Sequence, residues 1–203
     1  MIRLSEPISH QAGTDPVEPM QPHRAPLRVV APVEELKPAA RLTLDQAFRL
    51  YSRYVAAIAK RLVGRDDDVD DVVQDVFLRA HKGLGELREP DALKAWLATV
   101  TVRVARRKLK LRRLGRVFGL GEAPEYEQVA SAGANAEDRA LLARLYAVLD
   151  TLPVDNRIAW TLRHIEGEKL EEVAGLAGCS LATAKRRIAA AQETIDGAFS
   201  HER

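Results

Sequence analysis

The segment WLATVTVRVARRKLKLRRLGR, residues 96–116, is the stretch from which the fold of this chain can be predicted. It ends in a dense run of cations, and no carboxylate occurs between Asp91 and Glu122. Its eight basic residues are Arg103, Arg106, Arg107, Lys108, Lys110, Arg112, Arg113 and Arg116. A row of cations at this density suits a polyanion with closely spaced charges, most often a phosphate backbone. The alternative is a solvated helix face, which is what most charge runs are.

The spacing within this segment favours a helix over a strand. Arg103, Arg106, Arg107 and Lys110 recur at i, i+3, i+4 and i+7, the spacing of one helix face. Another face carries apolar residues at the same kind of spacing: Leu93, Trp96, Leu97, Val100 and Val104. Residues 99–104 also alternate and are rich in β-branched side chains, which is typical of a strand. Because no turn residue interrupts residues 91–114, a stretch too long for a typical strand, we predict a helix.

The overall composition indicates a helical protein with strongly segregated charge. The chain has 203 residues, of which 46% are hydrophobic and only 5% aromatic. This composition, rich in Ala, Leu and Val, favours helical packing over a β-sandwich. The net charge of +2 conceals two patches, because residues 66–91 carry nine acids against three bases and residues 92–121 carry nine bases and no acid. A sum near zero therefore says nothing about either patch.

The sequence carries no pattern typical of disulfide bonding, secretion or membrane insertion. Cys179 is the single cysteine, so no intramolecular disulfide can form. No apolar run approaches the roughly 20 residues of a membrane span, and the N-terminus lacks the apolar core of a signal peptide. Residues 1–40 hold seven of the ten prolines and are predicted to be a disordered arm. We therefore expect a soluble cytoplasmic protein without direct membrane insertion.

Two helices are predicted between the arm and the basic segment. The first spans residues 42–63, with Thr43 as N-cap and Gly64 as its stop. The second spans residues 66–82 and opens with three aspartates, which the helix dipole favours at that end. Beside its buried stripe it has a second face, made of Asp71, Gln74, Asp75 and Leu78. We interpret this face as a docking surface for a protein partner, the alternative being a solvated face with a stray leucine.

The C-terminal part of the chain is predicted to end in a helix-turn-helix. Residues 114–135 are rich in glycine and have no sustained period, which predicts a flexible linker. Helices follow at residues 136–149 and from Pro153 to Gly167. A short helix at residues 170–177, a turn at Gly178 and Cys179, and a longer helix capped by Ser180 complete the pattern. An ordinary helical hairpin with a basic tip is the alternative interpretation.

In a helix-turn-helix, the residues near the start of the second helix enter the major groove of DNA. In this chain those residues are Ala182, Thr183, Lys185, Arg186 and Arg187. Arginine and lysine can bond guanine edges or phosphates, and threonine suits either. The second helix of the motif is therefore predicted to bind DNA.

Three segments together resemble a bacterial RNA polymerase sigma factor of the extracytoplasmic-function (ECF) class of the sigma-70 family. DVVQDVFLRAHK, residues 71–82, is similar to the helix by which such factors dock on core RNA polymerase. LKAWLATVTVRVARRKLKLRR, residues 93–113, is similar to the segment that melts and reads the minus-ten promoter element. Residues 149–195, from LDTLPVDNRIAW to AAAQETI, are similar to the domain that reads the minus-thirty-five element. The resemblance covers residues 42–195, and the order of the segments also fits.

The resemblance implies an all-α protein of two small helical domains. Residues 41–113 would form the region 2 domain, residues 114–135 the linker and residues 136–203 the region 4 helix-turn-helix domain. The implied partners are core RNA polymerase, promoter DNA and an anti-sigma factor. The implied polymerase-binding residues are Asp71, Gln74, Asp75 and Leu78. The implied minus-ten residues are Trp96, Arg103, Arg106, Arg107, Lys110 and Arg113. The implied minus-thirty-five residues are Ser180, Ala182, Thr183, Lys185, Arg186 and Arg187.

The chain also departs from the family pattern. Family members often carry Asn where Arg103 stands and Asp where Arg107 stands, so the family's minus-ten preference is not carried over. Both differences add cations and favour more electrostatic binding. Lys169 stands where a Ser cap is common, and its charge is unfavourable at a helix start. By spacing, Trp96 is better placed in the core than at the DNA.

Two other classes of protein fit parts of the sequence. A stand-alone helix-turn-helix regulator would bind DNA but would need no polymerase-docking face. An enzyme would need paired catalytic carboxylates, a Gly-rich phosphate loop or a cluster of metal ligands, and the sequence offers none of these. The aspartate-rich second helix also lacks the glycine and glutamate positions of a calcium loop. We therefore predict no catalytic residues, no cofactor and no metal.

Overall fold

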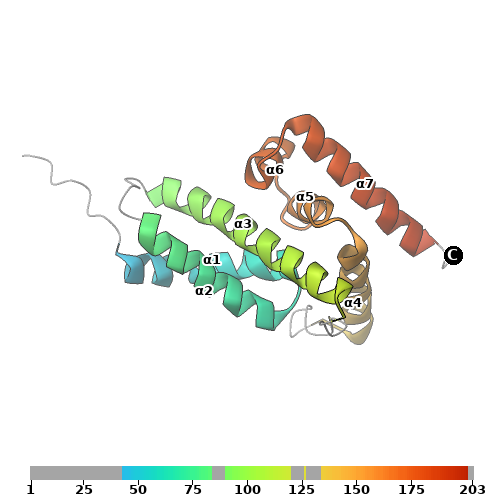
Figure 1. Ribbon diagram of the computed structural model, residues 1–203, viewed down its shortest axis with the longest axis horizontal. Helices are drawn as coiled ribbons and strands as arrows, with labels where there is room; N and C mark the ends of the chain where they lie inside the picture. The colour runs from blue at the N-terminus through green and yellow to red at the C-terminus, as the bar shows by residue number, and fades with distance from the viewer. Residues whose placement is uncertain (1–42, 84–89, 120–125, 127–133, 201–203) are drawn as a thin grey trace, which may run out of the picture. The chain divides into compact units, whose positions relative to one another are not determined.

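Helices make up all of the regular secondary structure that the structure describes. The computed structural model describes residues 43–83, 90–119, 126 and 134–200. The helices are α1 (Leu44–Val63), α2 (Asp66–Gly83), α3 (Pro90–Val117), α4 (Ala136–Thr151), α5 (Val154–His164), α6 (Leu170–Ala177) and α7 (Leu181–Ser200) (Figure 1). The predicted all-α class is confirmed. The predicted N-terminal arm and most of the predicted linker lie outside the described residues, so the flexibility of that linker stays a prediction.

The first helix begins and ends where the sequence predicts. Thr43 and Gln46 form a capping box, in which each side chain accepts a hydrogen bond from the other residue's backbone N–H, at 3.2 and 2.9 Å. Gly64 follows the helix with a φ of 78°, a left-handed conformation that glycine adopts without steric cost. A side chain on Gly64 would also collide with the ring of Tyr146, because an added Cβ would lie 2.3 Å from it.

The basic segment forms the 28-residue helix α3, which runs four residues into the predicted linker. The strand-like alternation of residues 99–104 does not mark a strand. It arises because this helix is buried on two sides. Val100, Val102 and Val104 are all less than 10% exposed, and α3 packs against α1 and α2 and also against α5 and α6. The hydroxyl of Thr101, which is fully buried, donates to the carbonyl of Leu97 at 2.7 Å. A β-branched residue is thereby accommodated inside the helix.

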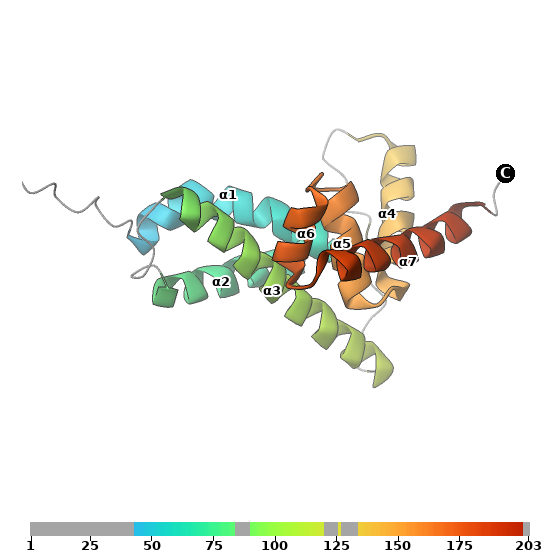
Figure 2. The same cartoon turned by 90° about the horizontal axis from the view of Figure 1, so that it is seen from above.

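The helices fall into an N-terminal half, α1–α3, and a C-terminal half, α4–α7, and the two halves share one apolar core. Within each half, consecutive helices pack against one another, as Figures 1 and 2 show. Between the halves, α5 contacts both α1 and α3, and α6 contacts α3. One cluster of buried residues accordingly includes Val55 and Leu97 from the first half and Ile158 and Val173 from the second. The sequence did not predict this contact between the halves.

A second, smaller cluster of buried residues joins α4, α5 and α7. Its members include Tyr146 and Leu149 from α4, Trp160 from α5, and Ile195 from α7. The Trp160 indole N–H donates to the amide oxygen of Gln192 at 2.7 Å, so the buried ring keeps its hydrogen bond. Within the described ranges, no helix is long and apolar enough to cross a membrane.

Candidate nucleic-acid and protein interfaces

The solvent-facing side of α3 carries three of the predicted minus-ten cations. Arg103, Arg107 and Lys110 are exposed. Trp96 is half-buried, and its ring packs so closely on Gly83 that a Cβ added there would lie 2.9 Å from it. The structure therefore keeps three cations on an open face and holds the tryptophan partly in the core. We call Arg103, Arg107 and Lys110 the open face of α3.

The other two predicted minus-ten cations contact the C-terminal half, although Arg113 is still exposed and only Arg106 is half-buried. The Arg106 guanidinium donates to the carbonyl of Ala177 at 2.6 Å and forms an ion pair with Asp155 at 2.9 Å. Arg113 donates to the carbonyl of Leu152 at 3.1 Å. These two arginines therefore act as contacts between the halves, a role that the sequence did not predict for them.

The predicted helix-turn-helix is present at α6 and α7. Gly178 ends α6 with a φ of 61°, in the left-handed region. The Ser180 hydroxyl accepts the backbone N–H of Thr183 at 3.2 Å, so Ser180 caps α7 as predicted. Cys179 is partly buried against the core, as a small apolar side chain in this turn would be.

The first turns of α7 present both free and paired side chains. Ala182, Lys185 and Arg186 are exposed, whereas Thr183 and Arg187 are half-buried. Arg187 lies 3.5 Å from the Asp155 carboxylate, the same group that pairs with Arg106. The residues predicted to enter the major groove are thus brought together, with Arg187 paired to Asp155 of α5 within the same half.

The predicted docking face of α2 borders two grooves of different character. Asp71 and Gln74 line one groove together with Arg107 and Lys108 of α3. The ammonium of Lys108 lies 2.6 Å from the Asp71 carboxylate, and this hydrogen bond raises the pKa of Lys108 above its ordinary value. Asp75 lies 3.8 Å from Arg79 on its own helix. Both aspartates of this face therefore have a cation nearby within the chain.

Leu78 lines the second groove, which is apolar and has a volume of about 390 Å³. This leucine is 58% exposed, and Phe48 of α1, on the facing wall, is 46% exposed. Phe48 meets Phe77 edge to face, with the ring centroids 4.9 Å apart. The face predicted for a protein partner therefore combines carboxylates on one side with an accessible apolar groove on the other.

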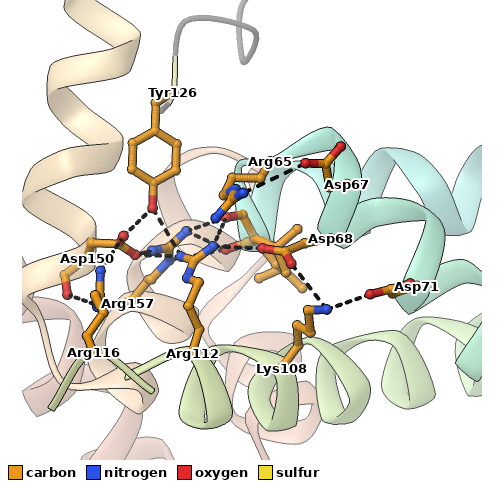
Figure 3. A network of polar contacts seen from close by, with 12 residues as sticks. Arg65, Asp67, Asp68, Asp71, Lys108, Arg112, Arg116, Tyr126, Asp150 and Arg157 are labelled. Atoms are coloured by element: carbon orange, nitrogen blue, oxygen red, sulfur yellow. Dashed lines mark hydrogen bonds and ion pairs between the residues drawn. The ribbon is translucent and has the colours of Figure 1, made fainter. Parts of the chain in front are cut away.

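A network of polar side chains joins the two halves around Asp150, near the end of α4 (Figure 3). We call its six members the Asp150 cluster: Asp68, Arg112, Arg116, Tyr126, Asp150 and Arg157. The Asp150 carboxylate accepts from Arg112 at 2.6 Å, from Arg116 at 2.8 Å, and from Arg157 and the Tyr126 hydroxyl. Arg112 also donates to Asp68 of α2 at 2.9 Å.

Arg157 is only 1% exposed and anchors α5 to the end of α1. Its guanidinium donates to the carbonyl of Leu62 at 2.9 Å and to that of Val63 at 3.0 Å. Carbonyls in the last turn of a helix have no partner within the helix and carry partial negative charge. A buried arginine from the C-terminal half therefore caps a helix of the N-terminal half.

The electrostatic balance of the cluster favours an ionised Asp150. Burial raises the pKa of this carboxyl, but the charges of Arg157 and Arg112 outweigh burial and bring the pKa below its ordinary value. Burial likewise raises the pKa of Tyr126, whose hydroxyl stays protonated and donates to the Asp150 carboxylate. Three guanidiniums surround two carboxylates here, and the excess cation is offset in part by the carbonyls that Arg157 caps.

Sequence reasoning missed Asp150, Arg157 and Tyr126, although two local signals were present. Asp150 stands in the last turn of α4, where the helix dipole disfavours a carboxylate unless a cation compensates it. Arg157 follows Val154 by three residues and precedes Thr161 by four, so it interrupts an apolar stripe of α5. A charge in such a position needs a buried partner. No comparable signal marks Tyr126.

The geometry defines a helical protein with exposed cations on α3 and α7 and one acidic and apolar surface on α2. Comparison with known families agrees with this description. The model of Sigma-70 region 2 matches residues 47–116, and that of Sigma-70 region 4 matches residues 142–194. In the described ranges, no three His, Cys, Asp or Glu side chains lie close enough together to hold a metal ion.

Individual similar proteins indicate which class of sigma-70 proteins the chain resembles. The ECF RNA polymerase sigma-E factor of Escherichia coli is 33% identical over 165 residues, which cover 75% of this chain and 86% of that protein. The RNA polymerase sigma-H factor of Pseudomonas aeruginosa is 27% identical over 184 residues, covering 82% and 91%. Among solved structures, the sigma factor RpoE from Bartonella quintana shares the fold, with a TM-score of 0.58 at 24% identity, covering 78% of this chain and 98% of that one.

The chain therefore belongs to the ECF class of RNA polymerase sigma factors. As a sigma factor, it directs core RNA polymerase to promoters for the initiation of transcription. This membership confirms the resemblance drawn from the sequence and does not favour the stand-alone regulator.

Proposed function

We propose that α2 docks this sigma factor on core RNA polymerase, that the open face of α3 binds the minus-ten element, and that α7 reads the minus-thirty-five element. In this assignment residues 41–113 act as the region 2 domain and residues 136–203 as the region 4 domain, joined by residues 114–135. The observation that carries the proposal is Leu78, a large apolar side chain that is 58% exposed beside an apolar groove on an acidic helix.

The surface of α2 supports docking on a helical, basic partner. An exposed leucine next to Phe48 and Phe77 offers an apolar anchor, which is the kind of group that dominates binding energy at protein interfaces. Asp71, Gln74 and Asp75 continue the same helix face and can meet cations and hydrogen-bond donors of the partner. A stand-alone DNA-binding regulator would have no use for this combination.

The cations of α3 and α7 support two separate DNA contacts. Arg103, Arg107 and Lys110 form an exposed row on α3 and suit the phosphates and unstacked bases of a melted strand. Lys185 and Arg186 are exposed at the start of α7, the part of a recognition helix that reaches base edges. Arg186 is therefore the first candidate for direct readout of the upstream element.

The remaining assignments follow from the role of a sigma factor. It acts with the polymerase on the chromosome, so we assign the chain to the cytoplasm and expect it to carry no catalytic activity of its own. An anti-sigma factor is a further proposed partner. Two solved sigma factors of this fold support it, since RpoE was solved in complex with the anti-sigma factor NepR, and CnrH in complex with the cytosolic domain of CnrY.

A transcription assay tests the promoter assignment. Purified core RNA polymerase is incubated with fragmented genomic DNA, either alone or with this protein, and the 5′ ends of the transcripts are sequenced. We expect the protein to add a set of start sites that share two upstream sequence elements. Start sites identical to those of core polymerase alone would contradict the proposal.

The same assay with Arg186→Ala separates the two DNA contacts. This variant should lose those start sites whose sequence is closest to the shared element farther upstream. Arg103→Ala should weaken transcription from all start sites, because Arg103 belongs to the face proposed to hold the melted strand. Equal loss at every start site for both variants would leave α7 without a role in sequence readout.

A further inference from the structure

The end of α3 carries an exposed apolar patch that none of the assignments above uses. We call it the apolar end of α3: Leu111, Leu114, Val117 and Phe118, which are 55%, 53%, 74% and 72% exposed. In the described part of the chain nine large apolar side chains are exposed, and four of them fall within these eight residues. The other five are spread over α1, α2, α4 and α7. Single exposed apolar residues are normal on a protein surface, but a cluster of them marks an interaction site.

The four side chains lie on one side of the helix. Leu111, Leu114 and Phe118 are spaced at i, i+3 and i+7, and Val117 follows Leu114 by three residues. The backbone N–H of Phe118 donates to the carbonyl of Leu114 at 3.1 Å, so Phe118 keeps its place in the helical register although α3 ends at Val117. Figure 2 shows this end of α3 extending past the start of α2. The patch is therefore a continuous surface on an ordered helix.

The arginines between these apolar side chains are engaged within the chain. Arg112 and Arg116 pair with Asp150, and Arg113 donates to the carbonyl of Leu152. A phosphate backbone is bound by free cations, and unstacked bases are bound by aromatic rings. Three of the four side chains in the patch are aliphatic and offer neither group. The apolar end therefore fits a protein surface better than it fits DNA.

A groove of about 330 Å³ joins the apolar end of α3 to the predicted docking face of α2. Leu111 lines this groove from α3, and Asp71, Gln74 and Asp75 line it from α2. Gln74 also lines the apolar groove beside Leu78, so the docking face of α2 lies between the two grooves. A partner that covers the aspartates of α2 thus reaches the apolar end of α3 across a single groove.

We propose that the apolar end of α3 is a second docking surface for core RNA polymerase, continuous with the docking face of α2. The inference rests on the assignment of α2 to the polymerase. The polymerase segment that fits this surface carries aliphatic or aromatic side chains, because only apolar partner atoms make the burial of these four residues favourable. The segment that meets Asp71 and Asp75 carries cations instead.

Titration of the fluorescently labelled full chain with purified core RNA polymerase measures the contribution of the patch. Leu114→Ser with Phe118→Ser should raise the Kd by about tenfold or more, because apolar side chains that a partner buries can dominate the binding energy. Leu50→Ser with Leu141→Ser is the matched control, since it also removes two exposed apolar side chains, from α1 and α4, and should leave the Kd unchanged. Circular dichroism and urea unfolding verify that both variants fold alike. Equal Kd values for the two variants overturn the proposal.

Photo-crosslinking identifies what covers the patch. A photoreactive benzophenone side chain is placed at Val117, and at Leu50 as the control position. With core polymerase and no DNA, position 117 should crosslink to a polymerase subunit and position 50 should not. A crosslink from position 117 to promoter DNA alone, or to a second copy of this chain alone, identifies a different occupant and overturns the proposal.

The α2 variant Asp75→Arg with Leu78→Arg separates a failure of this inference from a failure of the assignment of α2. If the α2 variant loses polymerase binding and Leu114→Ser with Phe118→Ser does not, α2 is the docking surface and the inference is wrong. If Leu114→Ser with Phe118→Ser weakens binding and the α2 variant binds as tightly as the unchanged chain, the assignment of α2 is wrong and α3 docks on the polymerase without it.

Discussion

Asp150 shows how one residue can connect distant parts of this chain. Its carboxylate is 6% exposed and accepts hydrogen bonds from three arginines and a tyrosine. Removing such a charge from water costs several kcal/mol, and the surrounding guanidiniums offset that cost only while every partner stays in place. Asp150 would therefore contribute little to stability as one isolated ion pair. It contributes much more as the centre of a network in which every polar group has a hydrogen-bond partner.

Asp150→Asn should destabilise the protein by about 3–5 kcal/mol, because it leaves Arg112 and the nearly inaccessible Arg157 without their shared counter-charge. Urea unfolding followed by circular dichroism measures this change. Glu137→Gln, on the exposed start of the same helix, should change the free energy of unfolding by no more than about 0.5 kcal/mol. Equal stability of the two variants would show that the cluster does not hold the halves together.

Tyr146 allows a test by pH. Burial raises the pKa of its phenol to about 12, and its hydroxyl donates to the carbonyl of Arg61 at 2.8 Å. The raised pKa means that the folded state favours the neutral phenol. Its contribution to stability is therefore complete below the ordinary pKa of about 10 and is lost as the pH rises through 12.

Spectrophotometric titration of tyrosinate should show one group ionising near pH 12 that is absent from Tyr146→Phe. In that variant the stability should fall less steeply between pH 10 and 12 than in the unchanged protein. If the group missing from Tyr146→Phe ionises near the ordinary pKa of about 10 instead, Tyr146 is neither buried nor bonded as described.

At the scale of the element, α6 begins at a residue poorly suited to that position. Lys169 is the N-cap of α6, makes no side-chain hydrogen bond to the helix, and places a cation where the helix dipole favours an anion. Lys169→Ser should stabilise the protein by about 0.5–2 kcal/mol, the usual value of a cap. Lys169→Gln removes the charge without adding a good cap, so it should raise the stability measured by thermal unfolding by less than Lys169→Ser does. An equal rise in the two variants would mean that the effect is due to charge alone.

The recognition helix supports a prediction about sequence readout. Arg186 is exposed near the start of α7, whereas Arg187 is half-buried beside Asp155. Arg186→Ala should weaken binding to the upstream element by about 1–3 kcal/mol if the side chain bonds a guanine. Titration of the holoenzyme with matched and mutated promoters measures this, and an equal loss on every sequence would identify a phosphate contact instead.

The helices themselves could be predicted because their signals are local. The N-cap at Thr43, the glycine stops and the apolar stripes are each read within a few neighbouring residues. The strand-like alternation of residues 99–104 was the exception, since it arises from burial of α3 on two sides. A second stripe of small and apolar residues on α3 was a usable sign of that burial: Ala98, Thr101, Val102, Ala105 and Leu109.

At the scale of the whole molecule, the contact between the halves could not be predicted from one sequence. Arg112 and Asp150 are 38 residues apart, and Arg157 and the carbonyl of Leu62 are 95 apart. The chemistry of a guanidinium does not say which of many carboxylates or carbonyls it will meet. Two other arginines of α3, Arg106 and Arg113, were therefore interpreted as cations for DNA, although both are bonded to the C-terminal half.

The docking of α2 on polymerase is the claim on which the whole assignment depends, and a binding measurement with purified core RNA polymerase tests it most directly. Three proteins are compared: the unchanged chain, the double variant Asp75→Arg with Leu78→Arg, and the matched control Asp138→Arg with Leu141→Arg. The control makes the same two changes, at the same spacing, on α4, where Leu141 is 55% exposed.

We expect the unchanged chain and the α4 control to bind the polymerase and the α2 variant to lose binding, because it places two cations where the partner needs a carboxylate and an apolar anchor. If the α2 variant binds core polymerase as tightly as the unchanged chain, α2 is not the docking surface and the assignment is wrong.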